Sequence, residues 1–473
     1  MKQFVAGEQD LHWSHEVVPP RTTEPDLNAP PLEWTPRSSL APPERVVHIA
    51  SEAHAREVLA NSRDSPVAML GGGFSRARIL RADSGLLLDV TGMAGLVRLD
   101  ASTATFGAGT RLETVHDLLR SIGRRMDCSP GVIAAQTLAG AVGTGTHGQG
   151  LRQSTLGDAL EAVRFVDGTG AVRVLRHSDP EFGALRLHLG RFGVLTELTI
   201  RTVPWSAYTC EKLAVTEAEL AVGFPRWNEQ YPFCKAWWFP DTGMAHVWRV
   251  RDASAAEQER LRRNDNRPVP LTGADHHLNA AVRATMAAMR RQLHSTDPRR
   301  DHFLTVTRFM DFHDVTGDLY DLLCKGIPVQ QVNLEVALPL ERFHRVQRVL
   351  REWFDERHPE LHYPVILRAT GPSKAWLSPA YGGSACHFGF VVYRATDGSI
   401  PGAAMRSVRE AEELLAAEGG RPHWGKHFTP RLYDFPRLFP RWDDFLDAAG
   451  DADPGGRFGN AFLRGLLWRR VAG

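Results

Sequence analysis

Glycine is concentrated in four segments of the chain, and this spacing is the feature that most limits what the chain can fold into. The segments are residues 71–73, 107–109 and 140–150 and the pair Gly190 and Gly193, and each of them ends or interrupts a strand-like run. Backbone amides that glycine leaves bare can hold phosphate groups or lie against a planar ring. A single segment of this kind is commonly a flexible turn. Four of them, in two successive α+β units, predict one long ligand that lies between the units.

The composition excludes several classes of partner. The net charge of +1 gives no argument for a nucleic acid or an anionic membrane, so a small-molecule substrate is the expected partner. The five cysteines are scattered and contain no C-x-x-C, which argues against a disulfide framework and a cysteine zinc site. The N-terminus lacks the apolar core of a signal peptide, and no apolar run reaches the roughly 18 residues of a membrane span. We therefore expect a cytoplasmic enzyme.

Apolar periodicity divides the 473 residues into four parts. The third part alternates long strands with helices, which is typical of a sheet that carries helices on one face. In order, the parts are a proline-rich arm at residues 1–43, a domain at 44–205 made of two α+β units at about 44–125 and 126–205, a cap domain at 206–420, and a glycine-rich, aromatic C-terminal segment at 421–473.

Two local signals are specific enough to be tested. Thr110 followed by Glu113 predicts a capping box at the start of the helix that ends at Gly123. Asp167-Gly168 lies between two alternating runs and predicts a β-hairpin.

Other sequence motifs remove the commonest enzyme classes. Residues 143–148, GTGTHG, satisfy G-x-G-x-x-G, but no amphipathic helix follows and Asp167 sits in the hairpin turn, so a Rossmann fold is not supported. The chain has no P-loop, no H-E-x-x-H and no G-x-S-x-G, and we predict neither a catalytic metal nor a hydrolase triad. A flavin dinucleotide has the length that the four glycine segments require.

The order of several segments resembles the vanillyl-alcohol oxidase (PCMH) type of FAD-binding flavoprotein, closest to the sugar-lactone oxidases (D-arabinono-1,4-lactone and L-gulonolactone) and alditol oxidases. The resemblance runs from about residue 44 to 471 and implies an α+β fold, with a two-part FAD-binding domain and an α+β substrate cap. The segments that carry it are VAMLGGGFS, GTRLETVHDLL, TLAGAVGTGTHGQG, LGRFGVLTELTIRTVP, ILRATGPSKAWLSPAYG, RPHWGKHF and DPGGRFGNAFLRGLL.

The resemblance implies a set of FAD-binding residues and a mode of attachment. Phe74 stands where covalent members carry the histidine that bonds the flavin, and no cysteine precedes the glycines of the second loop, so FAD is expected to be non-covalent. The implied cofactor-binding residues are Gly71, Gly72, Gly73, Phe74, Ser75, Arg76, Thr137, Gly140, Gly143, Thr144, His147, Gly148, Gly190, Gly193, Val194, His423 and Lys426.

Three residues are candidates for catalysis. Lys426 matches the lysine that family members place near flavin N1 and the C2 carbonyl, where a cation stabilises the reduced flavin. Arg368 matches the cap arginine of the alditol oxidases. Glu335 is either a pocket acid or a satisfied buried carboxylate. His147 is expected to shape the loop beneath the flavin.

The chain also departs from the alditol-oxidase pattern. The position two before the cap arginine is acidic in that pattern and is Ile366 here, and a histidine of the next strand appears as Phe388. With Trp376, Phe390 and either Trp237 or Trp238, these residues predict an aromatic substrate pocket. Because buried sugar hydroxyls need polar partners, such a pocket favours a less polar substrate than a polyol.

The leading hypothesis is an FAD-dependent oxidase that takes hydride from a CH–OH or comparable C–H carbon, with molecular oxygen as electron acceptor. One alternative is a flavoprotein of the same fold that catalyses a non-redox cyclisation or elimination in natural-product biosynthesis. Others are a sugar-lactone oxidase proper and a binding module without turnover. The residues leave open the substrate, the electron acceptor, the oligomeric state and the role of the N-terminal arm.

Overall fold

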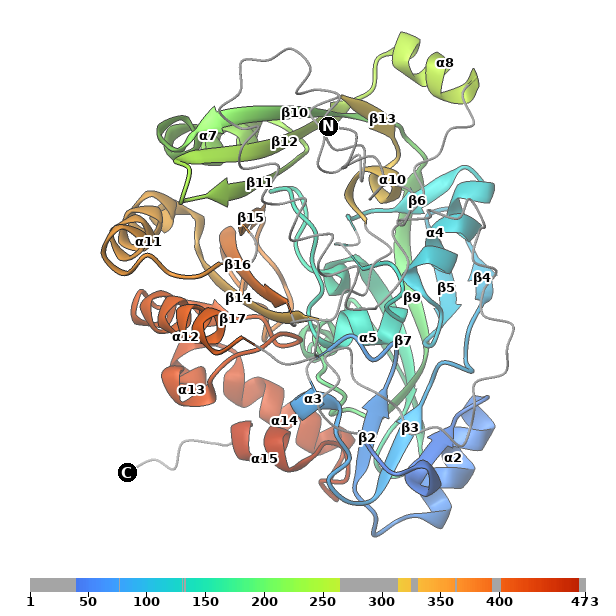
Figure 1. Ribbon diagram of the computed structural model, residues 1–473. Coiled ribbons are helices and arrows are strands. Elements are labelled where there is room, and N and C mark those ends of the chain that lie inside the picture. Colours follow the sequence, from blue (N-terminus) through green and yellow to red (C-terminus); the bar gives the residue numbers. More distant parts are fainter. Residues whose placement is uncertain are drawn as a thin grey trace, which may run out of the picture.

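A computed structural model gives the fold of residues 40–467, except residues 76, 130, 132, 264–313, 325–330, 362–363 and 394–400. The proline-rich arm predicted for residues 1–43 therefore lies almost wholly outside the described residues. Three sheets organise the chain (Figure 1). Among the helices of the described residues, none combines the length and the hydropathy that a membrane span requires.

The first sheet is parallel and has three strands in the order β1-β3-β2. Helix α2 begins where Ser51 caps it by accepting a hydrogen bond from His54 N, and it buries Ala55 and Leu59, one turn apart, against the sheet. The elements are β1 (Val46–His48), α2 (Glu52–Asn61), β2 (Val67–Leu70), α3 (Ala77–Leu80) and β3 (Leu86–Asp89).

The second sheet is antiparallel, with the order β4-β5-β9-β7-β8 and β6 paired to β9. Strands β4 and β5 belong to the segment that the sequence analysis assigned to the first α+β unit. In the structure β5 pairs with β9 of the second sheet. The division between the two sheets therefore lies after β3 and not near residue 125. The elements are β4 (Leu96–Leu99), β5 (Thr103–Gly107), α4 (Leu112–Ser121), β6 (Arg124–Met126), α5 (Leu138–Gly143), β7 (Leu160–Val166), β8 (Val172–Arg176), α6 (Phe182–Leu185) and β9 (Val194–Pro204).

One of the two local signals is confirmed and the other is wrong. Strands β7 and β8 form the predicted hairpin, and Asp167 Oδ1 closes its loop by accepting from Thr169 N and Ala171 N at 2.9 and 3.0 Å. The capping box does not form, because Thr110 turns back on the preceding loop and bonds Gly107 O at 2.6 Å. Helix α4 begins one residue later than a Thr110 cap would place it.

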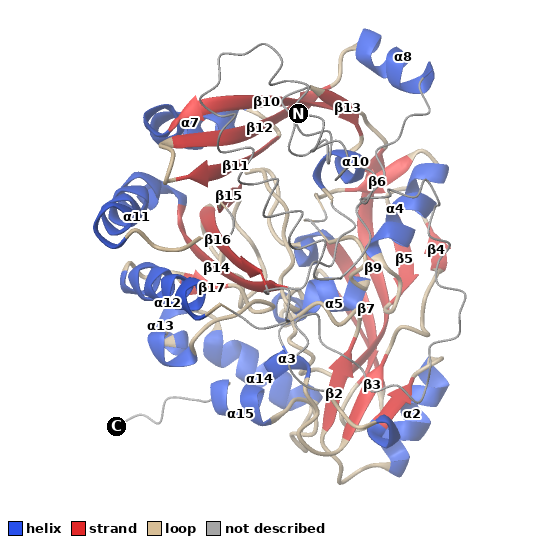
Figure 2. Ribbon diagram, in the orientation of Figure 1, coloured by secondary structure: helices blue, strands red, loops and turns tan. Residues whose placement is uncertain are grey.

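The cap is an antiparallel sheet with the order β13-β10-β12-β11-β15-β16-β14-β17. Helices α7, α11 and α12 cover one face, as the sequence predicts, and the other face lies toward the FAD-binding part (Figure 2). The elements are β10 (Tyr208–Thr216), α7 (Glu217–Gln230), β11 (Phe233–Phe239), β12 (Met244–Asp252), α8 (Ala255–Arg263), β13 (Val315–Gly317), α10 (Leu319–Leu323), β14 (Gln331–Pro339), α11 (Phe343–Arg357), β15 (Val365–Thr370), β16 (Ala385–Tyr393), α12 (Gly402–Ala417) and β17 (Arg421–Pro422).

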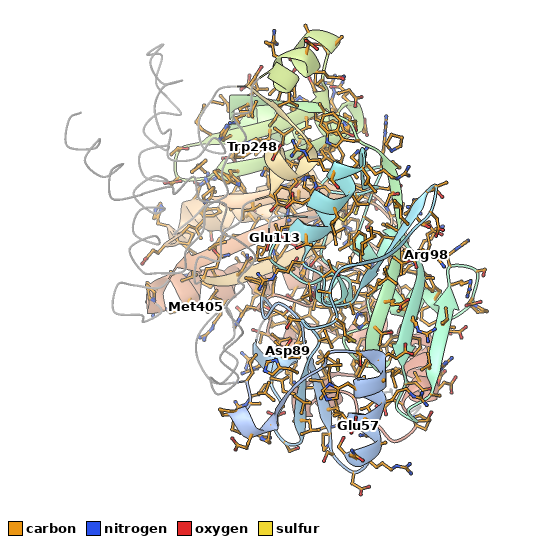
Figure 3. All side chains as sticks on the ribbon, turned by 90° about the vertical axis from the view of Figure 1, so that its right-hand side faces the viewer. Glu57, Asp89, Arg98, Glu113, Trp248 and Met405 are labelled. Atoms are coloured by element: carbon orange, nitrogen blue, oxygen red, sulfur yellow. The ribbon has the colours of Figure 1, made fainter. Side chains whose placement is uncertain are left out.

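The C-terminal segment crosses back from the cap to the first sheet. Val67 on β2 donates to Arg457 O at 2.8 Å and accepts from Gly459 N at 2.9 Å. In Figure 3, Asp89 marks this end of the molecule and Trp248 marks the cap at the other end. The helices are α13 (Phe435–Leu438), α14 (Trp442–Ala452) and α15 (Ala461–Leu466).

A buried ion cluster joins the two domains where α4 meets the start of α10. Asp318 contacts His116 at 3.1 Å and Arg120 at 3.0 Å, and it caps α10 by accepting from Asp321 N. Burial opposes ionisation of Asp318, but His116 and Arg120 outweigh it and the pKa is lowered to about 2. The carboxylate is therefore a charged contact between the cap and the FAD-binding part.

Replacing Asp318 by alanine should lower the free energy of unfolding by about 3–5 kcal/mol, because it removes the buried carboxylate that contacts both His116 and Arg120. The exposed pair Arg98–Asp100 is the control, and Asp100→Ala should change stability by less than about 0.5 kcal/mol. Chemical denaturation followed by tryptophan fluorescence compares the two. Equal losses would contradict the role assigned to the cluster.

Candidate functional site

A cavity of about 850 Å³, including the part open to solvent, lies between the first sheet and α5. It is lined by eleven of the residues that the sequence predicted for the cofactor, namely Gly71, Gly72, Gly73, Phe74, Ser75, Thr137, Gly140, Gly143, Thr144, Gly190 and Gly193.

Close packing explains two of these glycines. A Cβ on Gly71 would lie 2.2 Å from Thr137 Oγ1, the side chain that caps α5. A Cβ on Gly143 would lie 2.8 Å from the ring of His188. Gly71 therefore allows the loop after β2 to approach the start of α5, Gly143 allows the segment around His188 to approach the end of α5, and both positions line the cavity.

The cavity has walls that the sequence reasoning missed. His188 is one of them. It is two residues before Gly190, so the glycine pair Gly190 and Gly193 was the signal that could have identified it. Burial lowers the pKa of His188 to about 4, and its Nδ1 accepts from Gly190 N at 3.0 Å. The remaining unpredicted lining residues are Ala68, Met69, Leu70, Ile79, Leu80, Val90, Gln136, Ala139, Leu189, Leu195, Gly459 and Leu463.

The other predicted cofactor residues lie elsewhere. Val194 packs in the core with Val166 and does not line the cavity. Arg76 is outside the described residues. His147, His423 and Lys426 gather instead around a carboxylate next to the cavity, and Gly148 O is 3.0 Å from His147 Nδ1.

That carboxylate is Glu335 on β14, only 1% exposed. Its Oε1 lies 2.7 Å from His147 Nε2, and its Oε2 accepts from Lys426 Nζ at 3.0 Å and from Arg368 Nη2. His387 on β16 stacks on His147, with ring centres 3.8 Å apart, and its Nδ1 is 3.8 Å from Glu335 Oε1. The structure thus brings together all three candidate catalytic residues.

Electrostatics fixes the charge states in this network. Burial by itself raises the pKa of Glu335, but Arg368, Lys426 and His147 outweigh it and hold the pKa well below its ordinary value. The pKa of Lys426 is lowered to about 8, chiefly by burial. Burial also lowers the pKa of His147 and that of His387. At neutral pH the network therefore holds one carboxylate, two cations and neutral imidazoles.

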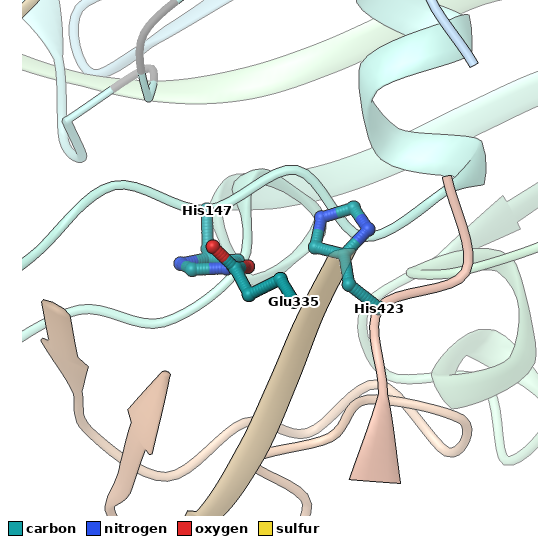
Figure 4. Close-up of side chains that lie close together, drawn as sticks. All are labelled: His147, Glu335 and His423. Carbon is teal, nitrogen blue, oxygen red and sulfur yellow. The ribbon is translucent and has the colours of Figure 1, made fainter. Parts of the chain in front are cut away.

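Three possible metal ligands converge here, from His147, Glu335 and His423 (Figure 4). Their donor atoms lie within 4.8 Å of one another. However, Arg368 and Lys426 already occupy the carboxylate, and two positive charges beside it oppose a metal cation. The donor set fits an organic ligand better than a metal.

Glu335 reaches Arg368 across an intervening strand, because position 389 of that strand is glycine. Glu335 pairs with Gly389, and Gly389 pairs with Ile366. A Cβ on Gly389 would lie 3.2 Å from Ile366 Cβ and 3.6 Å from Glu335 Oε2. The acid that the family pattern puts at position 366 is absent, and Arg368 receives a carboxylate from β14 instead.

The loop that carries Lys426 joins this network to the cavity. His423 N donates to Glu335 O at 3.0 Å, and Gly425 N donates to His423 Nδ1 at 3.1 Å. A Cβ on Gly425 would lie 3.2 Å from Thr144 and 3.3 Å from Ser75 Oγ, two residues of the cavity wall. The charged network is therefore next to one end of the cavity.

Most of the predicted aromatic pocket is wrong. Phe388 and Phe390 lie on the helix-covered face of the cap sheet, in its apolar core. Trp376 packs in a different core, where Arg441 lies 4.2 Å from the centre of its ring. Adjacent strand residues face opposite sides, so an alignment error of one position exchanges core and pocket. His387, the residue before Phe388, pairs with Arg368 and lies on the face of Glu335.

Two predicted pocket residues remain on the face of Glu335 and Arg368. Ile366 is two residues before Arg368 on β15, and Trp237 pairs with Ile366 from β11. Trp238 faces the helices and belongs to the core. Of the residues predicted for the substrate pocket, Ile366 and Trp237 are therefore the apolar ones on this face of the sheet.

Comparison with known proteins agrees with this architecture. Residues 198–466, more than half of the chain, match the family described as D-arabinono-1,4-lactone oxidase, and residues 43–176 match the FAD binding domain. The chain is 26% identical over 449 residues to an L-gulono-1,4-lactone dehydrogenase of Mycobacterium tuberculosis, covering 91% of this chain and 98% of that protein. It is 26% identical over 404 residues to an alditol oxidase of a Streptomyces species, covering 79% and 85%.

Solved structures show the same fold. The crystal structure of cholesterol oxidase from B. sterolicum superposes with a TM-score of 0.72 over 95% of this chain and 99% of that one, at 16% identity. At this identity the likeness concerns the arrangement of the FAD-binding part and the cap.

Substitutions at positions 388 and 366 should separate core from pocket. Phe388→Ala should cost about 3–5 kcal/mol of stability and leave the substrate preference of the folded protein unchanged. Ile366→Ala should cost less stability and change the KM ratio between apolar and polar substrates. Denaturation and steady-state kinetics on both variants provide the check, and a changed preference in Phe388→Ala would contradict the assignment.

Proposed function

Because the chain belongs to the D-arabinono-1,4-lactone oxidase family and contains an FAD-binding domain, it is an FAD-dependent oxidoreductase that acts on CH–OH donors, and we propose that its substrate loses hydride to a non-covalently held flavin. The observation that supports this most is the contact of Gly425 with Ser75 and Thr144, which puts Lys426 and Glu335 beside the cavity. Bound FAD supplies the hydride acceptor, flavin N5.

Arg368 orients the substrate in this proposal. Its Nη2 is held by Glu335, while its buried Nε has no hydrogen-bond partner among the described residues. A buried donor without an acceptor is costly. An oxygen of the substrate would satisfy it and hold the reacting carbon in place.

His387 accepts the hydroxyl proton in this proposal. Its Nε2 lies 2.9 Å from Thr370 Oγ1, and its buried Nδ1 has no hydrogen-bond partner in the described part of the chain. When Nε2 carries the proton, Nδ1 is a free acceptor. Glu335, 3.8 Å away, would stabilise the positive charge that forms on the ring.

Lys426 supplies positive charge at the flavin in this proposal. The family resemblance places this charge at the N1–C2 edge of the flavin. Lys426 is fixed in place by Glu335, the same carboxylate that holds Arg368. A fixed cation beside developing negative charge lowers the energy of the transition state.

We further propose oxygen as the electron acceptor and a substrate with an apolar frame. One relative is an L-gulonolactone oxidase of Mus musculus, 23% identical, whereas the mycobacterial relative is a dehydrogenase. Ile366 and Trp237 support the apolar frame. All five cysteines are buried free thiols, which supports a reducing, cytoplasmic compartment.

Lys426→Met should slow flavin reduction by roughly 10²- to 10³-fold while FAD stays bound, because it removes the charge and keeps most of the volume. In the wild type, kcat/KM should fall as pH rises through about 8, since Lys426 then loses its proton. Lys426→Arg should abolish that fall. Anaerobic stopped-flow measures the reduction rate, and Lys374→Met at an exposed lysine is the control.

If product forms while no CH–OH compound bleaches the flavin under anaerobic conditions, the redox proposal is wrong. That result would favour a non-redox cyclisation or elimination. A wild-type reduction rate in the FAD-loaded Lys426→Met variant would remove Lys426 from the mechanism.

Acid precipitation of the yellow holoprotein should release FAD into the supernatant. The physical reason is Phe74, which lines the cavity and has no atom that can bond the flavin. Phe74→His should give partial covalent attachment, seen as flavin fluorescence that remains with the protein on a denaturing gel. Flavin retained in the pellet of the wild-type protein would contradict non-covalent binding.

A further inference from the structure

The imidazole of His188 is bonded to the backbone through both of its nitrogens. Its Nδ1 lies 3.0 Å from Gly190 N, and its Nε2 lies 3.2 Å from Ala139 O on α5. Burial lowers the pKa of His188 to about 4, so the ring carries one proton at neutral pH. Because a backbone N–H can only donate, Nδ1 is the acceptor, and the proton lies on Nε2, which donates to Ala139 O.

The two residues after His188 form a left-handed turn. The backbone angle φ is 50° at Leu189 and 69° at Gly190. This conformation is costly for a residue that has a Cβ atom, so Leu189 depends on support from its surroundings. The support comes from α5, since Leu189 N donates to Gly143 O at 2.9 Å, and from the ring of His188, which accepts from Gly190 N.

This turn spans the wall of the cavity from α5 to the first sheet. His188, Leu189 and Gly190 all line the cavity. On one side, a Cβ on Gly190 would lie 3.5 Å from Met69 Cβ on β2. On the other side, the ring of His188 is so close to α5 that a Cβ on Gly143 would lie 2.8 Å from it. The ring therefore lies where the spacing between α5 and β2 is set.

We propose that His188 is a positioning residue for the cofactor. Its imidazole clamps the turn at Leu189 and Gly190 to α5, and this clamp gives the cavity the width that FAD needs. The inference rests on the proposed function, because it takes the cavity as the site of a non-covalently held FAD. FAD then binds to a wall that is already ordered, which avoids the entropy cost of fixing the turn on binding.

Two substitutions separate the hydrogen bonds of the ring from its volume. His188→Phe keeps a ring of similar size but leaves Gly190 N and Ala139 O without their partner. In His188→Asn, Oδ1 takes the place of Nδ1 and can accept from the backbone amide two residues further on, as asparagine does in turns. Phe165→Leu is the control for a general loss of stability, because Phe165 on β7 is buried in a core and does not line the cavity.

Dilution of the full-length, FAD-loaded protein, followed by the fluorescence of the released flavin, gives the Kd of FAD for each variant. His188→Phe should raise the Kd by about 10- to 100-fold, the scale of leaving buried backbone groups unpaired. His188→Asn should bind FAD about 5- to 10-fold more tightly than His188→Phe, through the bond to Gly190 N. Phe165→Leu should lower the denaturation midpoint and leave the Kd within about twofold of the wild-type value.

Hydrogen exchange of the same samples follows the clamp without reference to activity or to the attachment of the flavin. Mass spectrometry reads the exchange on the peptide that contains Leu189 and Gly190. This peptide should be protected in the wild type and in His188→Asn, and it should exchange at least about tenfold faster in His188→Phe.

Three results would overturn the clamp. One is a Kd of FAD in His188→Phe equal to that of the wild type. Another is an equal Kd in His188→Phe and His188→Asn. The third is an equal rise of the Kd in Phe165→Leu, which would mean that any loss of core stability weakens FAD binding.

The two proposals fail in different ways. If the flavin of the wild-type protein cannot be released, non-covalent binding is wrong, and the exchange of the peptide with Leu189 and Gly190 still decides the clamp. If the flavin is released and His188→Phe keeps both the wild-type Kd and the wild-type protection, the proposed function stands and the clamp is wrong.

Discussion

The buried carboxylate of Glu335 is the interaction on which the rest of the site depends. An isolated charge at such depth would be protonated or would destabilise the fold, and removing one partner of a buried ion pair is among the most damaging of changes. Arg368, Lys426 and His147 keep it ionised, and they come from the cap sheet, the C-terminal loop and the FAD-binding part. One charge therefore ties three regions of the chain together at the place where they meet.

The cofactor cavity has the same composite origin. Its walls come from the loop after β2, from α5, from the turn before β9 and from Gly459 near the C-terminus. The last of these is held because residues on either side of Phe458 hydrogen-bond to Val67 of β2. The cavity is thus complete only when the segment around Gly459 has paired with β2. The shape of the cavity also depends on close contacts of glycine backbone, such as that of Gly71 with Thr137.

The two faces of the cap sheet carry different kinds of side chain. On the helix side, Phe388 and Phe390 fill an apolar core. On the opposite side, neighbouring strands carry Glu335, Arg368 and His387. Since side chains alternate along each strand, every strand contributes to both, and neighbouring residues have unrelated roles.

The sequence alone determined the FAD-binding fold with its cap, the hairpin at Asp167, eleven of the residues that line the cavity, and the three polar residues Glu335, Arg368 and Lys426 beside it. The glycine wall and the hairpin follow from local turn chemistry and the sheet of the cap from apolar periodicity, whereas the FAD-binding fold and the polar residues follow from the family resemblance that the order of the motifs carries. Only the tertiary structure decided which sheet receives β5 and that Thr110 hydrogen-bonds to its own loop. It also decided that Phe388 lies in the core while His387 lies in the site. The ion pair of Glu335 with Arg368 across Gly389 likewise came from the tertiary structure alone. The physical reason is that strand pairing and facing join residues distant in sequence, and a shift of one residue reverses a side chain without altering the pattern that predicts the strand.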